Sequence, residues 1–85
     1  MTTFTKWTNP SNGAVRVYIG GFGAAKVWAE KCDLDSFGYE YKIVAKNDSR
    51  NRSEIGNIVN DAETAIFAAA GSRIKSFAAV VALAK

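Results

Sequence analysis

Histidine is absent from this 85-residue sequence, and cysteine and proline each occur only once. A chain without histidine lacks the commonest general base and the commonest metal ligand of proteins. Its single cysteine, Cys32, excludes an internal disulfide, suits a reducing compartment and has no histidine that could activate its thiol. We therefore expect Cys32 to be a half-buried residue at a strand end, and we expect no catalytic residues, no bound metal and no cofactor.

Long apolar stretches are missing as well. None is long enough to span a bilayer, and the N-terminal residues lack the apolar segment of a signal peptide. We therefore expect a soluble, cytoplasmic protein that does not contact a membrane. An apolar fraction of 48% and a charged fraction of 22% are typical of a folded domain, and we expect residues 1–85 to form a single one. The net charge of +3 is sufficient for solubility and also suits an anionic partner.

The most regular pattern in the sequence is that of a helix over residues 53–70. Apolar residues recur there at spacings of three and four, which places them on one stripe of a helix: Ile55, Ile58, Val59, Ala62, Ile66 and Ala69. Ser53 is a suitable N-cap, and Asn51, followed by Glu54 as in a capping box, is the alternative. Gly71 follows the last alanine, where a left-handed residue commonly ends a helix.

Four stretches before this helix alternate between apolar and polar residues, as strands do. They cover residues 2–8, 14–19, 24–32 and 37–46, and the strongest turn signal, residues 9–13, contains the only proline and an Asn-Gly pair. After Gly71, the apolar run 77–84 fits a buried strand or a second short helix, and Val80, Val81 and its length favour the strand. The prediction is an α+β fold: a mainly antiparallel, four- or five-stranded sheet with one long helix packed on one face.

This order of elements resembles the N-terminal half of the ribonuclease H fold. Residues 15–19 look like the first strand of that family, residues 20–24 like its glycine-aromatic-glycine stretch, and residues 51–55 like the start of its first helix. The catalytic aspartates of the family are missing, because glycines follow Ile19 and no carboxylate occurs in 77–84; only Glu54 remains. Since two-metal chemistry needs several convergent carboxylates, the resemblance implies a topology without nuclease activity.

The sheet face that the long helix leaves uncovered is the predicted binding site. The residues on it are basic and aromatic, and those expected to bind a partner are Arg16, Tyr18, Lys26, Trp28 and Lys42. Such a face can stack the bases of a single strand, or it can anchor a protein interface. Alternatively, Tyr18 and Trp28 pack as a cross-strand pair that only stiffens the sheet. Arg50 and Arg52 add basic side chains at the start of the helix, where anions bind favourably.

A small domain of this type is similar to the phage-encoded inhibitors of bacterial defence known as anti-CRISPR proteins, and residues 1–5, Met-Thr-Thr-Phe-Thr, resemble the start of some of them. The resemblance implies a CRISPR effector complex as the partner. The predicted function is therefore that of a non-enzymatic inhibitor that docks on a host defence protein or nucleoprotein complex and blocks nucleic-acid or partner binding. The alternatives are a single-stranded nucleic-acid-binding protein that uses the same face, and a structural subunit that self-associates through its N-terminal edge strand or its apolar C-terminal run.

Overall fold

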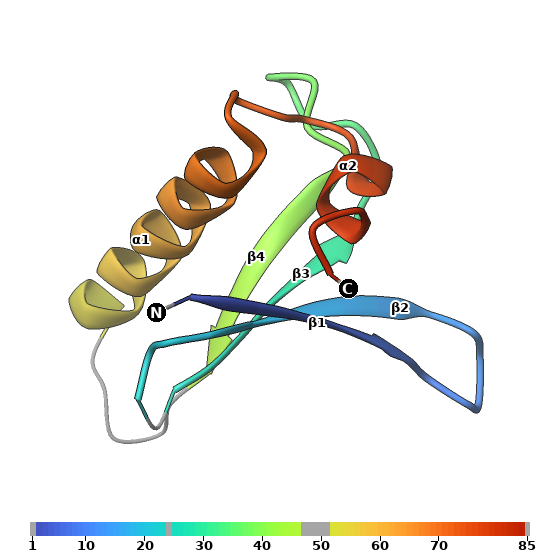
Figure 1. The fold of residues 1–85 in the computed structure, drawn as a ribbon, viewed down its shortest axis with the longest axis horizontal. Coiled ribbons are helices and arrows are strands. Elements are labelled where there is room, and N and C mark those ends of the chain that lie inside the picture. The colour runs from blue at the N-terminus through green and yellow to red at the C-terminus, as the bar shows by residue number, and fades with distance from the viewer. Residues whose placement is uncertain (1, 24, 47–51, 85) are drawn as a thin grey trace.

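The fold is an antiparallel sheet followed by two helices. The structure is a computed structural model that describes residues 2–23, 25–46 and 52–84. The sheet has four strands in chain order, each paired with the next: β1 (Thr3–Thr8), β2 (Val15–Gly20), β3 (Lys26–Lys31) and β4 (Tyr41–Lys46). Helices α1 (Arg52–Ala70) and α2 (Phe77–Val81) follow, and both pack on the same face of the sheet (Figure 1). This confirms the predicted α+β class, with four strands within the expected range.

The turn predicted at residues 9–13 joins β1 and β2 into a hairpin. The amide of Asn9 donates to the carbonyl of Ala14 over 2.7 Å. The side-chain oxygens of Asn9 and Asn12 accept from the amides of Ser11 and Ala14, both over 2.8 Å. Gly13 has a φ of 74°, which a residue without a Cβ adopts at no steric cost. The asparagines and the glycine therefore fix the register of the hairpin.

All four strands begin later than the sequence pattern predicts, β1 and β2 by a single residue. β3 starts at Lys26 instead of residue 24, and β4 starts at Tyr41 instead of Phe37. The second difference has a clear cause, because the carboxylate of Asp35 accepts from the amides of Phe37 and Tyr39 over 2.8 and 2.9 Å. These bonds, together with Gly38 at a φ of 85°, hold residues 37–40 in a loop. The alternation of aromatic residues there is therefore not that of a strand.

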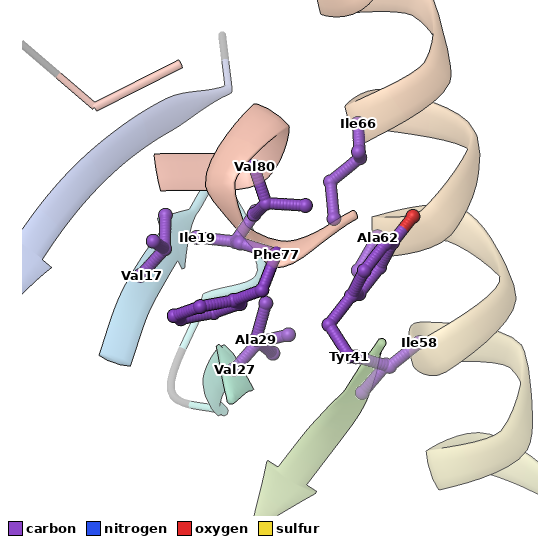
Figure 2. Packing of buried hydrophobic residues seen from close by; sticks show 10 residues of the cluster. All are labelled: Val17, Ile19, Val27, Ala29, Tyr41, Ile58, Ala62, Ile66, Phe77 and Val80. Carbon is purple, nitrogen blue, oxygen red and sulfur yellow. The ribbon is translucent and has the colours of Figure 1, made fainter. Parts of the chain in front are cut away.

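The hydrophobic core lies between the sheet and the two helices, as Figure 2 shows. Its buried members come from strands β2, β3 and β4 and from both helices: Val17, Ile19, Val27, Ala29, Tyr41, Ile58, Ala62, Ile66, Phe77 and Val80. Burying one large aliphatic side chain stabilises a protein by about 1.5–3 kcal/mol. The helical stripe predicted from the sequence supplies Ile58, Ala62 and Ile66, which confirms that this stripe is the buried face of α1.

Helix α1 extends one residue beyond the predicted N-terminal boundary. It begins at Arg52, so Ser53 lies inside the first turn and is not the N-cap. The alternative cap, Asn51, lies outside the described residues. At the other end, Gly71 has a φ of 76°, as predicted for the residue that ends the helix.

The strand expected over residues 77–84 is wrong, because Phe77–Val81 form the short helix α2. The hydroxyl of Ser76 accepts from the amide of Ala79 over 3.2 Å and caps its first turn. Phe77 and Val80 are three residues apart, so both reach the core from one side of the helix (Figure 2). The ribonuclease H resemblance implied a strand at this position, and the structure has a helix there instead.

Candidate functional site

The candidate site is the face of the sheet opposite α1 and α2, which we call the open face. Strand register determines which side chains meet there. Trp7 of β1 is opposite Arg16 of β2, and Tyr18 of β2 is opposite Trp28 of β3. Trp28 is in turn opposite Val44 of β4. Because side chains alternate between faces, these residues share one face with the others predicted for the site.

Arg16 is held between two indole rings on this face. Its guanidinium carbon Cζ lies 4.5 Å from the centre of the Trp28 ring and 5.5 Å from that of Trp7. Its Nη1 also donates to the hydroxyl of Tyr18 over 3.2 Å. A cation above an aromatic face gains about 0.5–2 kcal/mol, more when water is excluded. The arginine is thus immobilised before any partner binds.

Three aromatic side chains form a row across β1, β2 and β3, which we call the aromatic row: Trp7, Tyr18 and Trp28. The ring centroids of Trp7 and Tyr18 are 6.2 Å apart with an interplanar angle of 76°. Those of Tyr18 and Trp28 are 5.7 Å apart, with the rings tilted by 49°. Such pairs contribute about 0.5–1.5 kcal/mol beyond the burial of their area. Tyr18 and Trp28 therefore do pack as a cross-strand pair, the arrangement considered as the alternative to a binding role.

Trp28 is not exposed to water, contrary to the expectation from its place on the uncovered face. Only 5% of its surface is accessible, whereas 38% of Trp7 is. The reason is its position in an inner strand, where Arg16 and Tyr18 lie against its ring and the ammonium of Lys46 lies 5.8 Å from the ring centre. Its indole Nε1 donates to Glu30 Oε1 over 3.0 Å. Trp28 is thus the buried end of the aromatic row, and Trp7 is its exposed end.

The other predicted site residues are distributed around this row. Lys26 and Lys42 are exposed on the open face, with Lys26 opposite Lys46 and Lys42 opposite Glu30 in the register. Arg50 lies outside the described residues, and Arg52 is the first residue of α1, with a side chain that is not described. Of the seven predicted residues, the structure therefore brings Arg16, Tyr18 and Trp28 together.

Sequence reasoning missed two members of the site, Trp7 and Lys46. The signal for Trp7 was available, since a hairpin with its turn at residues 9–13 places Trp7 beside Arg16. It also missed Leu34 and Phe37, which are 67% and 74% exposed in the β3–β4 loop. Contiguous exposed apolar patches often mark interaction surfaces, whereas single exposed apolar residues are common.

One ionisable group on the other face of the sheet is strongly perturbed. Burial raises the pKa of Tyr41 to about 12, and the negative charge of Glu63 and the neighbouring Tyr39 act in the same direction. The hydroxyl of Tyr41 donates to the carbonyl of Ile74 over 2.8 Å, which joins β4 to the connection between the helices. This interaction is structural, because Tyr41 belongs to the core and not to the open face.

Residues 2–23, 25–46 and 52–84 contain no cluster of three or more cysteine or carboxylate side chains arranged to hold a metal ion. Neither of the two described helices combines the length and hydrophobicity that crossing a membrane requires. Comparison of the chain with protein-family models, with curated proteins and with solved structures finds no match. The geometry of the open face is therefore the main indication of function.

Proposed function

We propose that this protein is a non-enzymatic binding protein that docks on a larger protein or nucleoprotein target through the open face. The observation that carries the proposal is the placement of Arg16 between Trp7 and Trp28, with Tyr18 beside it. Tryptophan, tyrosine and arginine contribute most of the energy at protein interfaces. Because stacking already fixes these side chains, docking costs less conformational entropy than it would for mobile ones.

The more specific form of this proposal is an inhibitor of a host defence complex. It is supported by the resemblance to anti-CRISPR proteins and by the exposed lysines beside the row, Lys26, Lys42 and Lys46, which suit a surface that also binds nucleic acid. In this role the protein occupies a recruitment or nucleic-acid surface in the cytoplasm and performs no chemistry itself.

Single-strand nucleic-acid binding is the second candidate, and the same lysines favour it. Base stacking requires accessible aromatic rings. Trp28 is covered by Arg16 and Tyr18, which leaves Trp7 as the most exposed ring of the row. One accessible ring at an edge strand is a small platform for several bases. We therefore favour a protein target, for which an immobilised arginine and tryptophan are sufficient anchors.

The experiment that tests the proposal is capture of partners from nuclease-treated bacterial lysate with tagged wild-type protein, the Trp7→Ala variant and the matched control Phe37→Ala. Both substitutions remove an exposed aromatic side chain, but only Trp7 belongs to the open face. We expect the wild type and Phe37→Ala to retain the same protein complex and Trp7→Ala to lose it. Loss with Phe37→Ala and retention with Trp7→Ala would contradict the proposal and place the interface on the β3–β4 loop.

A second measurement separates the two candidate functions. Binding of a fluorescent single-stranded oligonucleotide is followed by anisotropy over a range of salt concentrations, because phosphate contacts weaken steeply as salt rises. Weak binding without sequence preference that disappears at physiological salt is the result expected for a protein-docking surface. Tight binding that Trp7→Ala abolishes would favour the nucleic-acid function instead.

A further inference from the structure

A groove lies between the β1–β2 hairpin and α2, at the place where Figure 1 shows the hairpin projecting beyond α2. We call it the hairpin–α2 groove. It has a volume of about 770 Å³, and its apolar surface includes Val15, Phe77, Ala78 and Val81. Cavities of this size are large enough for several side chains of a bound segment.

The charges around this groove are mainly positive. Lys6, Arg16 and Lys31 line it, with Glu30 as the one carboxylate among the described lining residues. That carboxylate already accepts a hydrogen bond from Trp28 Nε1. Lys6 and Lys31 are exposed, and neither has an ion-pair partner in the part of the chain that the structure describes. The groove therefore suits a segment that combines apolar side chains with carboxylates.

The β3–β4 loop of the same chain has this chemistry. Leu34 and Phe37 are its most exposed apolar side chains, and Asp33 and Asp35 lie beside them in the sequence. Neither Leu34 nor Phe37 lines the groove of its own molecule.

The loop is also held by several hydrogen bonds. The amide of Gly38 donates to the carbonyl of Asp35 over 3.1 Å, and the ammonium of Lys75 donates to the carbonyl of Phe37 over 3.0 Å. These bonds add to those that the Asp35 carboxylate accepts from the amides of Phe37 and Tyr39. A loop held in this way displays its apolar side chains at little entropic cost on binding.

We propose that this protein self-associates by inserting the β3–β4 loop of one copy into the hairpin–α2 groove of another. Leu34 and Phe37 of the inserted loop lie against Val15, Phe77 and Val81, and Asp33 faces Lys31. The two surfaces differ, so the contact is heterologous, and it closes into a small oligomer or extends into a chain according to the rotation between copies. This proposal does not depend on the proposed function, because its apolar contacts are with Val15, Phe77 and Val81, although Trp7 and Arg16 of the open face also line the groove.

The test is sedimentation velocity of the full chain over a wide concentration range, with one variant defective in each surface. The loop variant is Leu34→Ser/Phe37→Ser, and the groove variant is Lys31→Glu/Ala78→Glu. All four residues are exposed, so neither variant removes a core contact. Lys26→Glu makes the same charge change as Lys31→Glu at an exposed residue outside the groove and is the matched control, while Lys31→Glu alone gives a milder groove defect.

We expect the mass of the wild type and of Lys26→Glu to rise with concentration, and each double variant alone to remain monomeric. Lys31→Glu alone should weaken association about tenfold or more. An equimolar mixture of the two double variants should regain association, because the mixture contains one intact loop and one intact groove. A wild type that stays monomeric throughout, variants that associate as the wild type does, or a mixture that stays monomeric would each overturn the proposal.

Discussion

The Arg16 guanidinium covers the ring of Trp28, with 4.5 Å between its Cζ and the ring centroid. A cation on β2 thus keeps water from an indole on β3, on the face that no described helix covers. The same guanidinium extends to Trp7 on β1, so a single side chain connects three strands. This contact contributes both to the stability of the sheet and to the shape of the open face.

Replacing Arg16 should therefore destabilise the fold although the residue lies on the uncovered face. We expect Arg16→Ala to lower the free energy of unfolding by about 1–2 kcal/mol, because two cation–aromatic contacts are lost. Arg16→Lys should be intermediate, since lysine keeps the charge but lacks the planar group that stacks. Urea unfolding measures both, with Lys26→Ala as an exposed control that changes stability by less than about 0.5 kcal/mol. An equal effect of Arg16→Ala and Lys26→Ala would contradict a stabilising role for the stack.

The two tryptophans should differ strongly in their effect on stability. Trp28→Ala removes a buried ring and should lower the free energy of unfolding by about 3–5 kcal/mol. Trp7→Ala removes a cross-strand neighbour at the edge and should cost about 1 kcal/mol or less. Thermal unfolding followed by circular dichroism distinguishes the two. If Trp7→Ala proved the more damaging, Trp7 would be a structural residue and unsuitable as a probe of binding.

Two glycines of the α1 region should respond to alanine with opposite signs. Gly56 lies inside α1, and a Cβ added there meets no atom within 4 Å, so Gly56→Ala should stabilise by about 0.5–1 kcal/mol. Gly71 has equal space, but its φ of 76° strains any residue with a Cβ. Gly71→Ala should therefore destabilise by about 1–2 kcal/mol. Urea midpoints of the two variants measure the difference, and a shift in the same direction for both would contradict the prediction.

The raised pKa of Tyr41 predicts that the protein loses stability in alkaline solution. Its pKa is raised from 10 to about 12 in the folded protein, so below pH 10 the phenol is neutral in both states and stability is unaffected. Between about pH 10 and 12 the unfolded state ionises first, and the free energy of unfolding should fall by at most about 2–3 kcal/mol. Tyr41→Phe should lack this fall, although losing the bond to Ile74 costs about 0.5–1.5 kcal/mol at neutral pH. Urea unfolding of the wild type and of Tyr41→Phe at a series of pH values tests this prediction. If the free energy of unfolding fell equally with pH in the two proteins, the prediction would be wrong.

The predictions that held were those determined by local chemistry. The apolar spacing at Ile58, Ala62 and Ile66 identified the buried stripe of α1, and the Asn-Gly pair identified the hairpin. These signals come from residues close in sequence, so no tertiary information is needed to interpret them. The run 77–84 was misassigned because its residues are apolar on every side, and only the cap at Ser76 and the position of the core distinguish a helix there.

The site was predicted in part, for a similar reason. Alternation along single strands placed Arg16, Tyr18 and Trp28 on one face, which the register confirms. The burial of Trp28 depends on side chains from other strands, above all Arg16 and Lys46, whose reach over its ring cannot be deduced from alternation. The exposure of Phe37 likewise depends on the Asp35 hydrogen bonds, which convert an apparent strand into a loop.

The order of the elements along the chain has a consequence for biosynthesis. All four strands precede both helices, so the sheet can form its hairpins while its apolar side still lacks a cover. Val17 and Val27 are buried in a core that also contains Phe77 and Val80 of α2, so this core is complete only after the last described helix has been made. A nascent chain that ends before residue 77 therefore exposes apolar side chains of the sheet to water. Chaperones and proteases recognise such exposed apolar surface.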